Sequence, residues 1–146
     1  LKPVWIVDDD RSIRWVLEKA LERQNIPNRS FESADDAMGE LSKIQKNAAP
    51  GDDNSRPAVV LTDVRMPGMD GFEFLEELRR DSDLRDTVVF VLSTSTREED
   101  IERCYEYQVA GYISKKTAGQ DLFLLSELLD AYWRLIEVSD QPLHSA

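Results

Sequence analysis

The stretch Ala58-Val59-Val60-Leu61-Thr62-Asp63 is an apolar run that ends in a carboxylate. A second apolar run, Val4 to Val7, ends in the same way at Asp8, Asp9 and Asp10. Runs of this kind are typical of strands that are buried on both faces of a parallel sheet. Ligands bind outside the carboxyl ends of such strands, near the point where the strand order reverses, so we expect a shared acidic site there.

Strand-like and helix-like segments alternate along the whole chain, which is the pattern of an α/β protein with a parallel sheet. The segments expected as strands are Val4 to Val7, Arg29 to Phe31, Ala58 to Asp63, Thr87 to Ser93 and Gly111 to Ser114. The segments expected as helices are the periodic run from Ile13 to Leu21, then Ala34 to Lys46, Gly71 to Arg80, Glu98 to Gln108 and Asp121 to Val138. These segments predict a single domain with five parallel strands.

Length and charge narrow the possible functions. The 146 residues suit one domain with a single core. The 18 basic and 29 acidic side chains give a net charge of −11, which argues against direct binding of nucleic acid or of an anionic membrane surface. No apolar stretch is long enough to span a bilayer, and the first residues lack a signal-peptide pattern.

Cysteine and histidine each occur once. A single cysteine, Cys104, excludes an internal disulfide and a cysteine-rich zinc site. The histidine, His144, lies in a polar tail, so we expect no histidine-based catalysis or metal binding. By default these features favour a reducing, cytoplasmic setting.

Polar residues also follow the last two predicted strands. Ser93 and Thr94 close the fourth strand, and Lys115 closes the fifth, just after Tyr112. Right-handed crossovers return every strand in the same direction, so all these ends lie on one edge of the sheet. An edge with carboxylates, a hydroxyl and an ammonium can bind a metal ion together with a phosphoryl group. Among metals, hard oxygen ligands of this kind suit Mg²⁺.

Four motifs stand in order along the chain: Val7 to Asp10, Leu61 to Gly71, Leu92 to Thr94 and Gly111 to Lys115. Through them the sequence resembles the receiver domains of bacterial two-component response regulators over nearly its whole length. The N-terminal half is most similar to receivers of nitrogen-regulation transcription activators, and the second half to single-domain regulators paired with bacterial phytochrome kinases. The resemblance implies a doubly wound, flavodoxin-like (βα)5 fold with strand order 2-1-3-4-5.

The resemblance also implies a phosphoryl site. Asp63 would be the phosphoacceptor, and a sensor histidine kinase or a phosphotransfer protein would supply the phosphoryl group. Asp8 and Asp9 would hold Mg²⁺ directly or through water, and Asp63 with the backbone carbonyl of Arg65 would complete the protein ligands. The chemistry agrees, because a carboxylate can attack phosphorus only when the negative charges of both partners are offset.

Three further residues would act as a switch by the same resemblance. Lys115 would pair with the carboxylate before transfer and with the phosphoryl group afterwards. Ser93 would bond a phosphoryl oxygen after activation, and Tyr112 would change rotamer when Ser93 moves. Taken singly, each has an ordinary alternative: a surface lysine, a common strand-end serine and a half-buried packing tyrosine.

The sequence departs from the family pattern at Lys116, where proline is usual, so the loop from Lys116 to Gln120 is expected to be less fixed. We assign residues 1–139 to the receiver domain and residues 140–146 to a polar C-terminal tail. Asp10 is expected to cap the first helix. Asp8 and Asp9 could in principle belong to a merely solvated turn, but the other three motifs favour the metal site.

Two surfaces indicate partners. Trp15 lies on the side of the first helix opposite its apolar residues. There it could contact an incoming kinase helix, or it could be an exposed tryptophan with no functional role. On the last helix, Leu124, Leu128 and Leu135 belong to a second apolar stripe beyond the core stripe. We expect this stripe to support a homodimer or a kinase-docked state through the fourth and fifth helices, unless the C-terminal tail covers it.

Other functions compete with the phosphorylation switch. A Mg²⁺-dependent phosphohydrolase would also form an aspartyl-phosphate, but such enzymes commonly place a second aspartate two residues after the nucleophile, where this chain has Arg65. A phosphorylation-independent binding module would not need the complete set of site residues. The chain could be a stand-alone regulator, which we favour, or the receiver of a longer transcription regulator; no motif identifies the kinase, the signal or the output.

Overall fold

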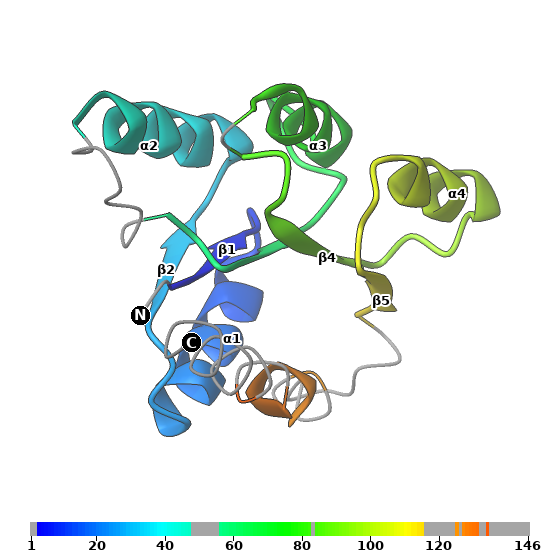
Figure 1. Cartoon of the computed structure of the whole chain (residues 1–146). Helices are drawn as coiled ribbons and strands as arrows, with labels where there is room; N and C mark the ends of the chain where they lie inside the picture. The colour runs from blue at the N-terminus through cyan, green and yellow to red at the C-terminus, as the bar shows by residue number, and fades with distance from the viewer. Residues whose placement is uncertain are drawn as a thin grey trace, which may run out of the picture.

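The computed structural model of the chain describes residues 3–47, 56–82, 84–115, 125, 127–131 and 134. Its strands are β1 (Val4–Val7), β2 (Asn28–Phe31), β3 (Val59–Thr62), β4 (Val88–Ser93) and β5 (Gly111–Ser114). Its helices are α1 (Arg11–Arg23), α2 (Ala34–Asn47), α3 (Gly71–Arg80) and α4 (Glu98–Glu106). The strands form one parallel sheet in the order β2-β1-β3-β4-β5, which confirms the predicted flavodoxin-like architecture (Figure 1).

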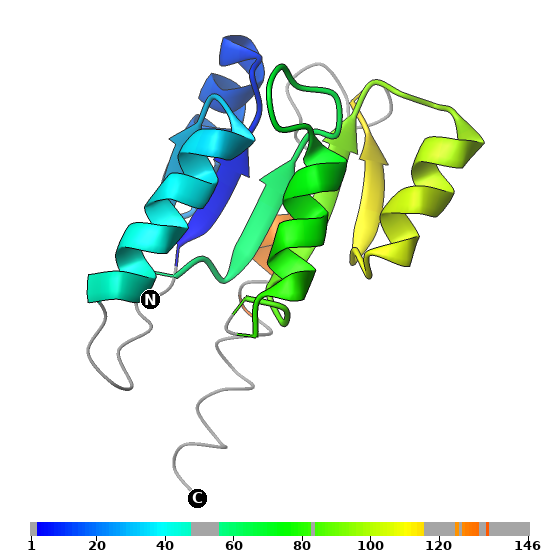
Figure 2. The same ribbon diagram turned by 90° about the horizontal axis from the view of Figure 1, so that it is seen from above.

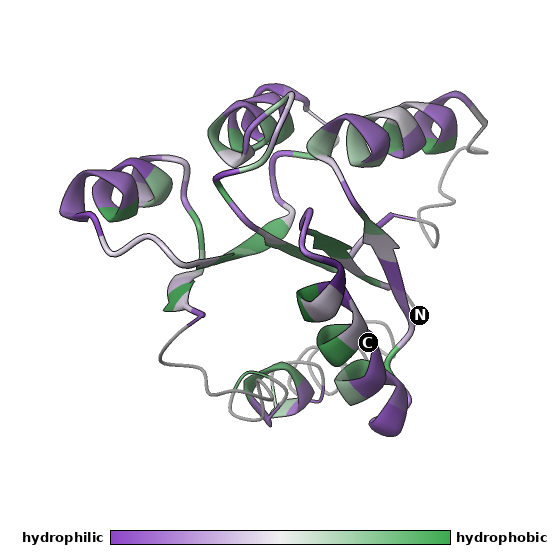
Figure 3. Ribbon diagram, turned by 180° about the vertical axis from the view of Figure 1, so that it is seen from behind, coloured by the Kyte–Doolittle hydropathy of each residue, from purple (hydrophilic) through white to green (hydrophobic). Residues whose placement is uncertain are grey.

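The three central strands, β1, β3 and β4, are buried on both faces of the sheet because their side chains alternate between two apolar clusters. Trp5 and Val7 of β1 point into the cluster that α2, α3 and α4 cover. Val4 and Ile6 point into the opposite cluster, which α1 covers (Figure 1). Coloured by hydropathy, the helices carry their polar faces outward (Figure 3). This double burial is the reason that β1, β3 and β4 read as nearly continuous apolar runs.

The residues that close the second cluster come from the end of the chain. Residues 125, 127–131 and 134 are helical, and Leu125 and Leu129 are each only 2% exposed against the α1 face of the sheet. The ends of the helix predicted for Asp121 to Val138 lie outside the described residues, as do the loop from Lys116 to Gln120 and the tail 140–146. No helix in the described part is both long and apolar enough to cross a membrane.

One predicted helix is two residues too long. The helix expected from Glu98 to Gln108 ends at Glu106, and Gln108 has a φ of +62°. Because a residue in this left-handed region cannot continue a right-handed helix, the chain turns here towards β5. The other predicted ends that fall on described residues agree with the structure to within a few residues.

Local signals bring the carboxyl ends of the strands close to their helices. Asp10 caps α1 as predicted, with its side chain accepting the N–H groups of Ser12 and Ile13. At the start of α3, a Cβ on Gly71 would overlap the backbone of Asp63 and Val64, so only glycine lets the chain return this closely. Viewed from above, the strands end at one edge of the molecule, among these loops (Figure 2).

Candidate functional site

Three carboxylates gather at the carboxyl edge of the sheet. Asp8 and Asp9 follow β1, Asp63 follows β3, and these two strands are neighbours in register. Each of the three side chains offers an oxygen within 4.8 Å of the others. Asp8 and Asp63 are buried and Asp9 is exposed. One buried pair with one exposed oxygen donor fits a divalent cation that keeps part of its water shell, which is how Mg²⁺ binds.

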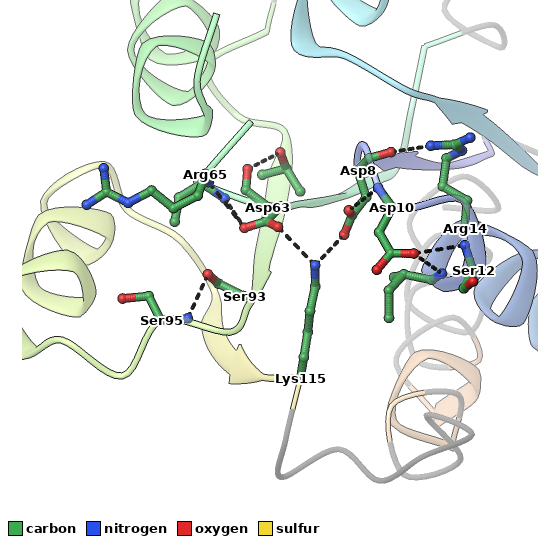
Figure 4. Close-up of polar contacts among 12 residues, drawn as sticks. Asp8, Asp10, Ser12, Arg14, Asp63, Arg65, Ser93, Ser95 and Lys115 are labelled. Atoms are coloured by element: carbon green, nitrogen blue, oxygen red, sulfur yellow. Dashed lines mark hydrogen bonds and ion pairs between the residues drawn. The ribbon is translucent and has the colours of Figure 1, made fainter. Parts of the chain in front are cut away.

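Lys115 lies between the two buried carboxylates. Its Nζ is 2.8 Å from Oδ2 of Asp8 and 2.9 Å from Oδ2 of Asp63 (Figure 4). Its side chain is 10% exposed. The contact with Asp63 agrees with the sequence prediction, whereas the contact with Asp8 was not foreseen. The ammonium therefore offsets the repulsion that two adjacent carboxylates would otherwise experience.

Burial and charge act in opposite directions at this pair. Burial raises the pKa of Asp8, and the hydrogen bond and positive charge of Lys115 offset this only in part. Burial alone would lower the pKa of Lys115, but the hydrogen bonds and charges of Asp8 and Asp63 outweigh it and raise that pKa. Lys115 is therefore a firmly charged ammonium that faces the phosphoacceptor candidate.

The carboxylate of Asp63 is fixed through both oxygens. Its Oδ1 accepts the backbone N–H groups of Val64 at 2.7 Å and Arg65 at 3.2 Å, and its Oδ2 accepts from Lys115. Sequence reasoning missed the two backbone donors, because any residue can supply an amide and only the turn geometry aims it. This arrangement holds the carboxylate in one orientation and withdraws part of its negative charge.

Ser93 and Tyr112 lie beside the site and both contact Ser95. Ser93 is fully buried at the end of β4, and its Oγ accepts the N–H of Ser95 at 3.2 Å. Tyr112 of β5 is half-buried, and its hydroxyl donates to the carbonyl oxygen of Ser95 at 2.7 Å. Ser93 and Asp63 are both described, and no hydrogen bond joins them. The predicted switch pair therefore meets at the loop that follows β4.

A second polar network lies on the outer side of Asp63 and was not predicted. Nη2 of Arg65 is 2.7 Å from Oδ1 of Asp100, and Oγ of Ser95 donates to Oδ2 of Asp100, also at 2.7 Å. The guanidinium of Arg65 points away from Asp63, towards α4 (Figure 4). The hydrogen bond from Ser95, then that from Arg65, lowers the pKa of Asp100 in spite of its burial. Asp100 could not be singled out from the sequence, because acidic residues are common in the first turn of any helix.

The two predicted partner surfaces are described only in part. Trp15 on α1 is 58% exposed, as its position on the helix predicted. Leu128 is 45% exposed, on the same helical segment as the buried Leu125 and Leu129. Leu124 and Leu135, the other members of the predicted stripe, lie outside the described residues.

Comparison with known proteins agrees with this geometry. The family model described as the response regulator receiver domain matches residues 4–126. The phosphorylated cyanobacterial phytochrome response regulator RcpA is 27% identical and superposes with a TM-score of 0.69 over 90% of both chains. The Mn²⁺-bound structure of response regulator Rcp1, a protein of Synechocystis, is 25% identical with a TM-score of 0.71, over 91% of this chain and 94% of that chain.

A longer relative matches part of the chain. The DNA-binding transcriptional regulator NtrC of Proteus hauseri is 43% identical over 76 residues, which is 52% of this chain and 14% of NtrC. The resemblances expected from the sequence, to nitrogen-regulation receivers and to phytochrome-linked regulators, are thus both found.

Proposed function

The chain belongs to the family of response regulator receiver domains, and from this premise we propose that it is a switch controlled by phosphorylation of Asp63. Receiver domains are signalling switches rather than classical enzymes, they bind a divalent metal, and histidine kinases or phosphotransfer proteins phosphorylate them. We extend this to residues 1–139 of the present chain, with Mg²⁺ as the metal.

The observation that carries the proposal is the position of Lys115, with its Nζ within 2.9 Å of Oδ2 of both Asp8 and Asp63. In the proposed reaction an oxygen of Asp63 forms a bond to phosphorus while the bond from phosphorus to the donor breaks. Lys115 stays beside the reacting carboxylate and pairs with the incoming phosphoryl oxygens. The backbone N–H groups of Val64 and Arg65 keep the carboxylate aimed during the transfer.

The metal would be held by the carboxylates of Asp8, Asp9 and Asp63 and by the backbone carbonyl of Arg65. When bound, Mg²⁺ supplies positive charge that offsets the repulsion between the carboxylate and the phosphoryl group. The donor set supports this choice, because the three carboxylates offer hard oxygens within 4.8 Å of one another.

The output would pass through the loop after β4. After phosphorylation, the hydroxyl of Ser93 bonds a phosphoryl oxygen, and the residues up to Ser95 move with it. Tyr112 follows, since its hydroxyl bonds the carbonyl of Ser95. The moving elements adjoin α4, so we propose that affinity for a partner or a second copy changes along α4 and the C-terminal helical segment, where Leu128 is exposed and where Leu124 and Leu135 belong to the same predicted stripe.

Trp15 is proposed as a contact for the kinase or phosphotransfer protein. It is exposed on α1, the helix that follows the metal-site residues Asp8 and Asp9 directly. An exposed tryptophan near the centre of an interface commonly contributes a large share of the binding energy.

Intact mass after incubation with Mg²⁺ and acetyl phosphate tests the phosphorylation step. We expect wild type to gain one phosphoryl group, Asp63→Asn to gain none, and a chelator to abolish the gain. A folded wild-type protein that binds Mg²⁺ but gains no mass would contradict the proposal. Turnover of small phosphomonoesters would instead favour the phosphohydrolase.

A further inference from the structure

The backbone carbonyl of Asp8 accepts a hydrogen bond from the side chain of Arg14, which lies in the first half of α1. Nη1 of Arg14 is 2.7 Å from this oxygen, and the guanidinium reaches it on the side away from Lys115 (Figure 4). A contact this short, from a charged donor, belongs to the stronger class of protein hydrogen bonds. None of the proposed metal ligands or phosphoryl contacts involves Arg14, so its side chain needs another explanation.

This carbonyl belongs to the peptide unit that joins Asp8 to Asp9, the two metal-ligand candidates that follow β1. A peptide unit is planar, so a hydrogen bond at its oxygen fixes the orientation of the whole unit and the direction in which the chain enters Asp9. Asp8 is only 2% exposed, so little water can replace the guanidinium as a donor. Without the guanidinium the carbonyl would lose a donor in a buried place, which costs free energy, and we expect the loop to rearrange.

The two candidates differ in how firmly their side chains are held. Oδ1 of Asp8 accepts the N–H of Asp10 at 2.9 Å, and Oδ2 of Asp8 pairs with Lys115 at 2.8 Å. Asp9 is exposed, and no hydrogen bond or ion pair joins its carboxylate to another described residue. The position of the Asp9 carboxylate therefore depends on its backbone, which Arg14 fixes at the preceding peptide unit.

We propose that Arg14 is a positioning residue for the metal: by holding the carbonyl of Asp8 it keeps the carboxylate of Asp9 at the site and so raises the affinity for Mg²⁺. This inference rests on the proposed function, in which Mg²⁺ binds at Asp8, Asp9 and Asp63. The oxygens of these three carboxylates lie within 4.8 Å of one another in the present shape of the loop. A loop that already has this shape binds the ion more tightly, because binding does not have to order it.

The charge of Arg14 acts in the opposite direction, because a cation near the site repels Mg²⁺. The guanidinium is half-buried and lies on the far side of Asp8, and ions in solution screen a repulsion of this kind (Figure 4). Loss of the positioning contact would weaken Mg²⁺ binding, whereas loss of the repulsion would strengthen it. The sign of the change in Kd therefore decides between the two effects, and we expect the positioning effect to be the larger at physiological ionic strength.

Calorimetric titration of the whole chain with Mg²⁺ measures this sign. Arg14→Gln should raise the Kd about tenfold, the lower end of the effect of residues that orient metal ligands. Arg14→Lys keeps the charge and a donor but not the planar fork, so it should recover only part of the lost affinity. Arg11→Gln is the matched control, because it removes the same charge from an exposed position at the start of the same helix. We expect this control not to raise the Kd.

A double-mutant cycle with Asp9→Asn separates positioning of Asp9 from a general loosening of the fold. Arg14→Gln should raise the Kd about tenfold when Asp9 is present, but less than about twofold in the Asp9→Asn background. A merely structural role of Arg14 would raise the Kd by the same factor in both backgrounds. Urea unfolding of each variant without Mg²⁺ verifies that the titrated protein is folded.

The role of Arg14 would be overturned by a Kd for Arg14→Gln at or below that of wild type, by an equal rise in Arg11→Gln, or by equal factors in the two backgrounds. A Kd for Arg14→Lys equal to that of wild type would have the same meaning if Arg14→Gln did not fold. Each of these results would leave the proposed function intact. Failure of wild type to bind Mg²⁺ would overturn the proposed metal site, and this inference with it.

Discussion

Two cations lie next to Asp63, and they are used in opposite ways. Lys115 points inward, is 10% exposed and contacts Asp63 and Asp8. Arg65 is only two residues from Asp63 in sequence, yet its side chain is 52% exposed and turns outward to Asp100 (Figure 4). Its backbone N–H nevertheless donates a hydrogen bond to the carboxylate of Asp63.

The difference shows that nearness in sequence does not decide which cation enters a site. A side chain three residues after a strand end can turn to either side of the loop, and Asp100 offers a buried partner on the outer side. Lys115, which follows β5, points inward because its ammonium pairs with the buried carboxylates of Asp8 and Asp63. The partner carboxylate, rather than the position of the cation in the chain, assigns each role.

The largest expected effect comes from removing the inward cation. Lys115→Met should slow phosphorylation by acetyl phosphate about 100-fold or more, since it deletes a preorganised charge at the reacting oxygen. The same variant should bind Mg²⁺ at least as tightly as wild type, because the ammonium contacts the same carboxylates as the metal. Time courses of intact mass and calorimetric titration measure the two quantities. A rate as high as that of wild type would show that Lys115 has no catalytic part.

Removing the buried carboxylate that Lys115 satisfies only in part should stabilise the fold. The pKa of Asp8 is raised above its ordinary 3.8, so the folded state holds a proton more readily than the unfolded state. The stability cost of Asp8 is therefore absent at low pH, appears as the pH rises through 3.8 and is complete at neutral pH. Asp8→Asn should raise the free energy of unfolding at neutral pH by about 1 kcal/mol and weaken Mg²⁺ binding.

Urea unfolding at neutral pH and again near pH 3.8 measures this effect, with magnesium titration alongside. The gain in stability should shrink at the lower pH. Destabilisation of Asp8→Asn at neutral pH would mean that the ion pair with Lys115 outweighs the burial of the carboxylate.

The smallest effect is expected from the outward cation. Arg65→Gln should lower the free energy of unfolding by no more than about 1 kcal/mol, because the guanidinium is half in water, and added salt should reduce the loss further. Urea unfolding at low and high salt gives the comparison. Arg97→Gln is the control, since both members of its pair with Glu99 are exposed, and it should change stability even less. A larger loss in Arg65→Gln would place its ion pair among the main supports of the fold.

The sequence predicted the ends of the strands better than the contacts between side chains. Asp8, Asp63 and Lys115 were placed on one edge because parallel strands share a direction, and the family resemblance gave them roles. The contact between Lys115 and Asp8 could not be predicted, because β1 and β5 are not neighbours in the sheet and their relative height depends on β3 and β4. The family resemblance indicated a role for the backbone carbonyl of Arg65 as a metal ligand. It could not indicate the partner of the Arg65 side chain, because that partner, Asp100, lies on α4 and its position depends on how α4 packs.

Gly71 limits which substitutions the site can tolerate. Every other amino acid carries a β-carbon, and at this position that carbon would overlap the backbone of Asp63 and Val64. Gly39, on α2, would meet nothing within 4 Å and is open to replacement. Any mutation of the codon for Gly71 that changes the amino acid would thus displace the main chain that carries the phosphoacceptor candidate, even though Gly71 itself contributes no functional group.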